Sequence, residues 1–158
     1  MSKEEAKTWM DTNKINCKII EEYSNDITKG KFVSQSILAN TVAHQGDKIT
    51  IVYSLGKEPT TEEKNALKKA ETYSNSLHMS KQGIYNQLTS SIEGFTKEAA
   101  QYAIDNIEAD WNKNALEKAK TYQTSMNMSS KAIYNQLVSS VEGFTKSEAQ
   151  YAIDNLDK

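Results

Sequence analysis

The side chains able to do chemistry are few in this sequence, and they are scattered. Its two histidines, His44 and His78, stand far from each other and from the single cysteine, Cys17. Nucleophilic catalysis needs a nucleophile with a base and an orienting group, and zinc sites need several histidine or cysteine ligands. Neither pattern occurs, and no glycine-rich loop is present to hold a phosphate. We therefore predict that the chain is not an enzyme and uses no metal or cofactor.

The charged residues argue against nucleic acid as the partner. The 158 residues include 19 basic and 21 acidic side chains, for a net charge of −2, and every basic residue is a lysine. Arginine is the usual bidentate reader of phosphate and guanine, and nucleic-acid-binding domains usually carry a basic excess. No apolar run approaches the roughly 20 residues of a membrane helix. We predict no membrane span in this chain, so any anchor would lie upstream of Met1.

An internal repeat organises the larger part of the sequence. Residues 66–108 align with residues 115–157 at an offset of 49, and 28 of the 43 positions are identical. The first 58 residues do not match the repeat, and the only proline, Pro59, lies at the junction. We predict three parts: a small module at residues 1–58, a first repeat at 61–109 and a second repeat at 110–158.

Each repeat is predicted to form three helices. Thr60 and Glu63 make a capping box at the start of the first helix. Ser80 and Thr96 are N-cap residues for the second and third helices. Gly94 is expected to adopt the left-handed conformation that stops a helix. The repeats are thus predicted to be helix-turn-helix-like units.

The segment between the repeats is predicted to be helical throughout. Nothing between Lys97 and Met126 is a glycine or proline, and apolar residues such as Ile107 continue the helical spacing. One shared helix of about 30 residues is therefore expected to join the two units.

Aromatic residues near the predicted apolar faces are expected to pack in the interior. Tyr73, Tyr102, Tyr122 and Tyr151 lie close to these faces, where a ring is buried and a hydroxyl stays wet. Trp111 is expected to pack where the two repeats meet. None of these five residues is assigned to partner binding.

Acidic and aromatic residues that recur in both repeats are the candidate partner-binding residues. The set comprises Glu93, Asp105, Glu142, Asp154, Tyr85 and Tyr134. The two tyrosines lie beside the apolar stripe, so their rings are expected to be partly exposed, and tyrosine is an efficient contact residue. One interpretation is an acidic, aromatic-edged surface for a basic or amphipathic partner segment. The other is an ordinary solvated face that recurs because the sequence is duplicated.

The first 58 residues are predicted to form an α+β module. Helical spacing covers residues 3–13, and β-branched residues indicate strands at 17–23, 32–36 and 49–54. The fold class predicted for the chain is mainly α, with this module followed by two three-helix repeats joined by a long shared helix.

The module resembles a PASTA domain, the family named for penicillin-binding proteins and serine/threonine kinases. The matching features are a Tyr-Ser strand end, a Lys-Gly turn, a Val-Ser-Gln-Ser strand, a Gly-Asp turn and a closing Ser-Leu-Gly-Lys-Glu. The family's opening strand is missing, and residues 36–40 replace its usual Ser-Pro-x-x-Gly. Some members bind peptidoglycan fragments, so the resemblance implies wall contact as one role for residues 3–58.

The repeats resemble the host cell-surface-exposed lipoprotein family, the module of Ltp-type superinfection-exclusion lipoproteins of temperate phages. Both copies contain ALxxAxxY, MSxxxIYxQL, EGFT and AxYAIDN. The resemblance implies a position on the outer face of a bacterial cell. It also implies a block of DNA entry by a related phage, through contact with its tape measure protein.

Two functional hypotheses follow. In the first, a non-catalytic surface protein blocks phage DNA injection because its repeats bind a phage component such as the tape measure protein. In the alternative, the chain is a peptidoglycan-associated surface binding protein of unknown partner. Both place it on the extracellular face of a bacterial cell, anchored by an upstream segment.

Overall fold

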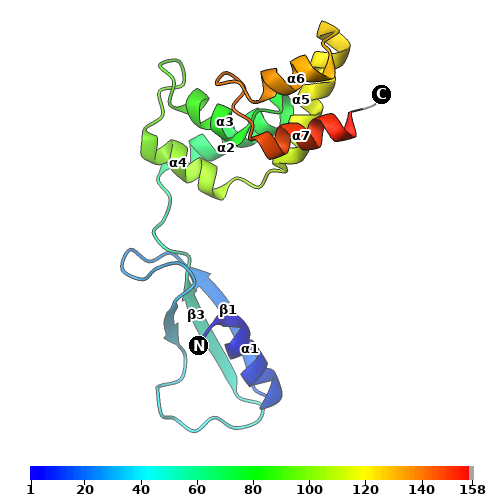
Figure 1. Ribbon diagram of the computed structural model, residues 1–158. Helices are drawn as coiled ribbons and strands as arrows, with labels where there is room; N and C mark the ends of the chain where they lie inside the picture. The colour runs from blue at the N-terminus through cyan, green and yellow to red at the C-terminus, as the bar shows by residue number, and fades with distance from the viewer. Residues whose placement is uncertain (157–158) are drawn as a thin grey trace. The chain divides into compact units, whose positions relative to one another are not determined.

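The computed structural model describes residues 1–156 (Figure 1). The chain divides into two compact units, Met1–Glu58 and Pro59–Lys158. The first unit contains α1 (Lys3–Thr12), β1 (Asn16–Glu22), β2 (Phe32–Gln35) and β3 (Lys48–Ser54). The second contains α2 (Thr61–Leu77), α3 (Lys81–Leu88), α4 (Lys97–Asn106), α5 (Trp111–Met126), α6 (Ser130–Leu137) and α7 (Lys146–Asn155). This arrangement confirms the predicted fold class, with one correction given below.

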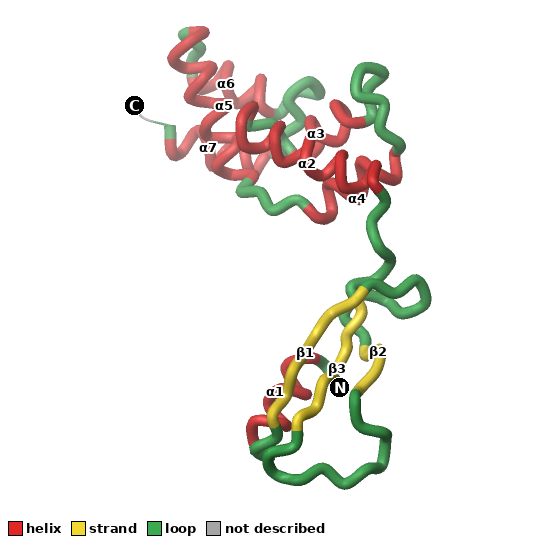
Figure 2. The backbone as a smooth tube through the Cα atoms, turned by 180° about the vertical axis from the view of Figure 1, so that it is seen from behind, coloured by secondary structure: helices red, strands yellow, loops and turns green. Residues whose placement is uncertain are grey.

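The first unit is a three-stranded sheet with a helix on one face. The strand order is β1-β3-β2, with β3 parallel to β1 and antiparallel to β2. The central strand β3 is rich in β-branched residues, which fit a strand paired on both edges. Helix α1 covers one face of the sheet (Figure 1). In the view turned by 180°, the strands lie in front of this helix (Figure 2). The buried core comprises Ala6, Met10, Ile15, Ile49, Ile51 and Tyr53.

Each repeat of the second unit has three helices around its own core. The first core is built by α2, α3 and α4, and the second by α5, α6 and α7. The capping box of Thr60 and Glu63 is confirmed, and Ser80 and Thr96 cap α3 and α4. Gly94 has a φ of +67° as expected, but it closes the turn that follows α3 rather than ending that helix.

The prediction of one long helix between the repeats was wrong. Helix α4 ends at Asn106, whose side-chain amide donates to the backbone oxygen of Tyr102 at 2.8 Å. The backbone of Ile107 is extended, and Asp110 is the N-cap of α5, accepting from the amide of Lys113 at 3.0 Å. The amide of Ile107 bonds the backbone oxygen of Ala103 at the end of α4, and Asp110 caps the start of α5. End groups of both helices are thereby bonded, so neither glycine nor proline is needed to break the helix.

The two repeats contact each other within the second unit. As predicted, Trp111 packs at their boundary, against the first core although it opens the first helix of the second repeat. Asn114 is buried and donates to the hydroxyl oxygen of Ser74 at 2.8 Å and to the backbone oxygen of Met79 at 3.0 Å. The hydroxyl of Ser80 donates to the backbone oxygen of Glu142. These polar contacts fix the position of one repeat relative to the other.

The other aromatic predictions hold with one exception. Tyr122 is buried, and Tyr73 and Tyr102 are half-buried. Tyr151 is 42% exposed. It lies beside, and not within, the inward stripe that includes Ala152, so the helix turns its ring outward.

Candidate partner-binding surface

The first repeat has an open depression of about 250 Å³ between α3 and α4. It is lined by Lys81, Gln82, Tyr85, Gln101 and Ile104. Tyr85 is half-buried, with its side chain packed against the edge of the first core. One aromatic ring, one aliphatic side chain, two amides and one cation therefore face a single opening.

Asp105 is linked to this depression through a lining residue. The side-chain amide of Gln101 donates to a carboxylate oxygen of Asp105 at 2.8 Å, one turn further along α4. The carboxylate remains exposed to solvent. Of the predicted residues, Tyr85 lines the depression and Asp105 bonds a residue that lines it. The structure also adds Gln101, which sequence analysis missed although its recurrence as Gln150 was visible.

The second repeat presents equivalent residues. Gln150 donates to Asp154 at 2.8 Å, and Asp154 is exposed. Tyr134 is half-buried against the second core, where Ile153 also packs. The glutamine–aspartate bond and the half-buried tyrosine therefore recur in both repeats.

The arrangement of each surface favours recognition over catalysis. The exposed carboxylate can accept hydrogen bonds from a lysine or arginine head group. The tyrosine ring can pack against the aliphatic stem of the same side chain. Because the aspartate is exposed and the tyrosine is half-buried on the neighbouring helix, the chemistry of each pair suits a segment with both apolar and basic side chains.

Glu93 lies elsewhere, in an internal contact of the first repeat. Its carboxylate accepts from the hydroxyl of Tyr73 and from Lys69 Nζ at 3.1 Å, and its side chain is only 15% exposed. The Tyr73 hydrogen bond, and then the Lys69 ammonium, lower the pKa of Glu93 below its usual value. Burial and the same carboxylate raise the pKa of Tyr73. This contact ties the turn after α3 to helix α2.

Glu142 makes the equivalent contact in the second repeat. Its carboxylate accepts from the hydroxyl of Tyr122 and lies 3.8 Å from Lys118 Nζ, again with a side chain 15% exposed. Burial, followed by the bond to Glu142, raises the pKa of Tyr122 to about 12. Sequence analysis missed both tyrosine–glutamate pairs, although both recur at the repeat offset. We call the two pairs Tyr85 with Asp105 and Tyr134 with Asp154 the tyrosine–aspartate surfaces. Glu93 and Glu142 are not part of them, because their carboxylates are engaged in internal contacts.

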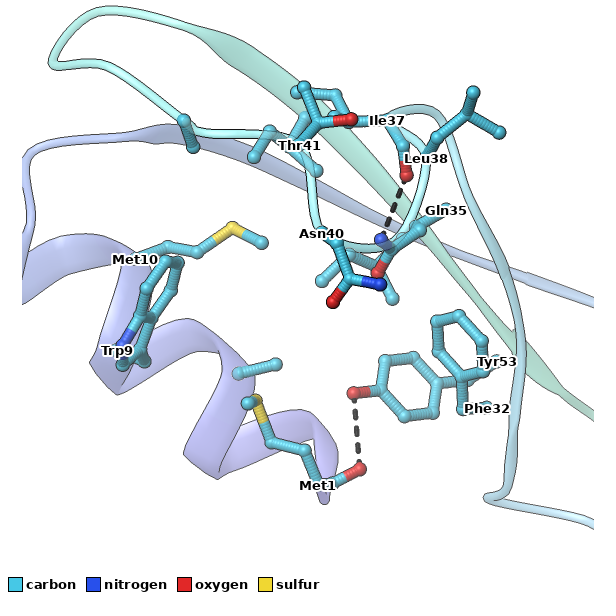
Figure 3. A pocket seen from close by; sticks show the side chains of 14 residues that line it. Met1, Trp9, Met10, Phe32, Gln35, Ile37, Leu38, Asn40, Thr41 and Tyr53 are labelled. Carbon is cyan, nitrogen blue, oxygen red and sulfur yellow. Dashed lines mark hydrogen bonds between the residues drawn. The ribbon is translucent and has the colours of Figure 1, made fainter.

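The first unit contains an apolar groove of about 270 Å³. Its walls come from α1, β2, β3 and the loop after β2, and include Trp9, Phe32 and Leu38, with the amides of Gln35 and Asn40 at the same opening (Figure 3). Trp9 and Phe32 are 47% and 46% exposed. The lining side chains among residues 1–156 carry no formal charge. Such a groove fits a neutral ligand with an apolar face.

The described residues contain neither a cluster of metal ligands nor a membrane-spanning helix. Within residues 1–156, no three histidine, cysteine, aspartate or glutamate side chains cluster as metal ligands. No helix in that range is long and apolar enough to cross a bilayer.

Comparison with known proteins defines the class of the chain. It belongs to the family described as host cell surface-exposed lipoprotein, whose model matches residues 61–107 and 110–156. The PASTA domain model matches residues 1–55. Both resemblances read from the sequence motifs are therefore confirmed.

One solved structure gives a more particular relationship. It is Ltp, a superinfection exclusion protein from the Streptococcus thermophilus temperate phage TP-J34, which is 43% identical to this chain with a TM-score of 0.58. The match covers 63% of this chain and 100% of that one. Comparison with curated proteins found no match.

Proposed function

We propose that this chain is a non-catalytic protein of the bacterial cell surface that excludes superinfecting phages. Its helical unit would bind a phage injection component, such as the tape measure protein, and so block DNA entry. The observation that carries the proposal is the 43% identity to a superinfection exclusion protein, together with two matches to the surface-exposed lipoprotein family.

The tyrosine–aspartate surfaces supply the contacts in this proposal. Tyr85 with Asp105, and Tyr134 with Asp154, present an aromatic ring and an exposed carboxylate in each repeat. A basic, amphipathic segment of the injection machinery is the partner whose chemistry fits them. Glu93 and Glu142 serve the same function indirectly, because their carboxylates hold the turns in place.

Phage plating tests the proposal. A susceptible bacterium would display residues 1–158 from a membrane anchor, and both plating efficiency and phage adsorption would be measured. We expect plating to fall for at least one phage while adsorption stays normal, because the block acts after attachment. Normal plating across a broad phage panel, with display verified on the cells, would contradict the proposal.

Paired substitutions locate the binding surface. Tyr85→Ala combined with Tyr134→Ala should restore plating by about tenfold or more, since loss of one hot-spot contact costs that much affinity. Tyr23→Ala is the matched control, because Tyr23 is an exposed tyrosine of the first unit. Equal effects of the double variant and the control would count against these surfaces.

The carboxylates are tested in the same way. Asp105→Asn combined with Asp154→Asn keeps side-chain size and removes two charges, so plating should recover. The difference in plating between the variant and the unaltered chain should be smaller at high salt, because salt already screens the charge attraction of the unaltered chain. Asp26→Asn, which removes one charge from the first unit, is the control for losing a carboxylate away from these residues. Exclusion that survives the double change would show that charge attraction is not needed.

Peptidoglycan binding is a second candidate function, favoured by the PASTA match and the apolar groove of the first unit. The exposed indole of Trp9 offers a stacking surface for a sugar ring. Cosedimentation of the chain with purified sacculi should be reduced by Trp9→Ala and unchanged by Tyr23→Ala. No cosedimentation of the unaltered chain would exclude wall binding.

A further inference from the structure

The two repeats contain the same turn in two different settings. We define the docked turn as residues 139–144 and the open turn as residues 90–95, with the sequences SSVEGF and SSIEGF. Both close with the same backbone bonds, from Gly143 to Ser139 and from Gly94 to Ser90, each 2.8 Å long. Any difference in their contacts therefore comes from what lies against them.

The docked turn rests on the N-terminus of α3 in the first repeat. The Ser80 hydroxyl donates to the backbone oxygen of Glu142 and accepts from the amide of Gly83 at 2.9 Å. A Cβ at Gly83 would lie 3.1 Å from Ser80 Oγ and 3.3 Å from that same Glu142 oxygen. A Cβ at Gly143 would lie 3.1 Å from Gln82 Cβ. The contact thus needs a serine N-cap, and a glycine three residues later.

An asparagine beside the docked turn completes the contact. The Asn114 amide donates to the Ser74 hydroxyl and to the backbone oxygen of Met79, the residue before the Ser80 cap. The docked turn and Asn114 therefore both bond residues at the start of α3.

The open turn keeps the same backbone groups, and within residues 59–156 no helix start lies against it as α3 lies against the docked turn. Asn65 occupies the position equivalent to Asn114 and is exposed on α2. A Cβ on Gly94 would meet nothing within 4 Å. Glu62 replaces Trp111 and is occupied by a bond from the amide of Thr96 at 2.9 Å. The turn and Asn65 are therefore the contact groups that remain available.

A second copy of this chain does not offer a fitting helix start. Its α3 already holds its own docked turn. Its α6 has Ser129 as N-cap, but Ala132 stands where α3 has Gly83, and Gln123 stands where α2 has Ser74. In the docked geometry an alanine Cβ at this position would lie 3.3 Å from the carbonyl oxygen of the turn, closer than an ordinary van der Waals contact. The fitting occupant is a different protein.

We propose that the open turn and Asn65 form a docking site for the N-terminus of a partner helix that begins Ser-x-x-Gly. The partner serine donates to the backbone oxygen of Glu93, and the partner glycine leaves room for that same oxygen, as Gly83 does for the oxygen of Glu142. Gly94 leaves room for the residue before the partner glycine, as Gly143 does for Gln82. The Asn65 amide donates to the backbone oxygen of the residue before that serine. This site is distinct from the tyrosine–aspartate surfaces and does not depend on the proposed function.

A peptide taken from the chain tests the proposal. The probe is a helix-constrained peptide of residues 78–90, HMSKQGIYNQLTS, titrated into the isotope-labelled full chain. The amide signals of Gly94 and Phe95 should shift, while those of Gly143 and Phe144 stay unchanged because the docked turn is occupied. A peptide with Gly83→Ala should bind at least about tenfold more weakly, which corresponds to a loss of about 1.4 kcal/mol or more in binding free energy.

Variants of the chain give the controls. Asn65→Ala should weaken peptide binding, and Asn75→Ala, at another exposed position of α2, should leave it unchanged. The proposal is overturned if millimolar peptide leaves Gly94 and Phe95 unshifted, if both peptides bind equally, or if Asn65→Ala has no effect. It is also overturned if these signals shift with protein concentration alone, because the occupant would then be a second copy.

Discussion

Removing one hydroxyl from the second repeat should destabilise the helical unit measurably. Tyr122→Phe keeps the buried ring but deletes the donor to Glu142, whose carboxylate is 15% exposed and otherwise has Lys118 Nζ at 3.8 Å. A hydrogen bond to a charged group is worth about 1.5–3 kcal/mol. We expect a loss of about 2 kcal/mol in the free energy of unfolding, because little water can replace the lost donor.

The first repeat provides the matched comparison. Tyr73→Phe removes the same bond to Glu93, but that carboxylate keeps Lys69 Nζ at 3.1 Å. The remaining direct bond should limit the loss to about 1 kcal/mol. In a unit of this size, each kcal/mol corresponds to about 4–8 °C in Tm.

Urea unfolding followed by tryptophan fluorescence measures both changes. The chain has two tryptophans, Trp9 in the first unit and Trp111 in the second. A Trp9→Phe background leaves Trp111 as the reporter of the helical unit, so unfolding of the first unit does not obscure the transition. The midpoint should fall with an unchanged slope. A loss under about 0.3 kcal/mol for Tyr122→Phe, or a larger loss for Tyr73→Phe, would refute the reasoning.

Three further predictions concern the turns and the repeat boundary. Gly143→Ala should cost about 1 kcal/mol more than Gly94→Ala in urea unfolding, because both have positive φ but only Gly143 has close neighbours; equal losses would contradict the docked contact. Asn114→Ala should cost about 1–3 kcal/mol, since it leaves buried acceptors unbonded, and Asn65→Ala should cost nearly nothing; calorimetry of both variants decides this. The pKa of Glu93 is lowered by folding, so its contribution is present above the ordinary glutamate pKa of about 4.3 and is lost as pH falls through the lower folded value. Glu93→Gln should therefore flatten the acid limb of stability against pH, and an unchanged limb would contradict it.

The tandem repeat and its caps were readable from the sequence because they depend on local rules. An N-cap side chain bonds an amide two or three residues away, as Thr60 does with Glu63, so the signal lies within one short segment. The missed helix break at Asp110 also followed a local rule, since aspartate is a strong N-cap residue. The apolar spacing continues across this break, so periodicity alone predicts one helix where the cap indicates two.

The candidate site was predictable only in part. Recurrence at the repeat offset marked Tyr85 and Asp105, and their helix positions placed both near the surface. The same recurrence marked Glu93 equally, because duplication copies internal and external residues alike. Whether a carboxylate faces solvent or a tyrosine hydroxyl depends on how a turn folds back onto a helix some 20 residues away.

The sequence by itself determined the family of this protein, its helical repeats and its shortage of catalytic groups, since these are properties of residue type and short spacing. Only the tertiary structure decided which acids are engaged internally and which turn is covered. The open and docked turns differ at one residue among six, so their contrast cannot lie within the turns. It arises because Ser80 and Gly83 meet Glu142 across 62 and 59 positions of chain, and such contacts are fixed by the packing of whole helices against one another.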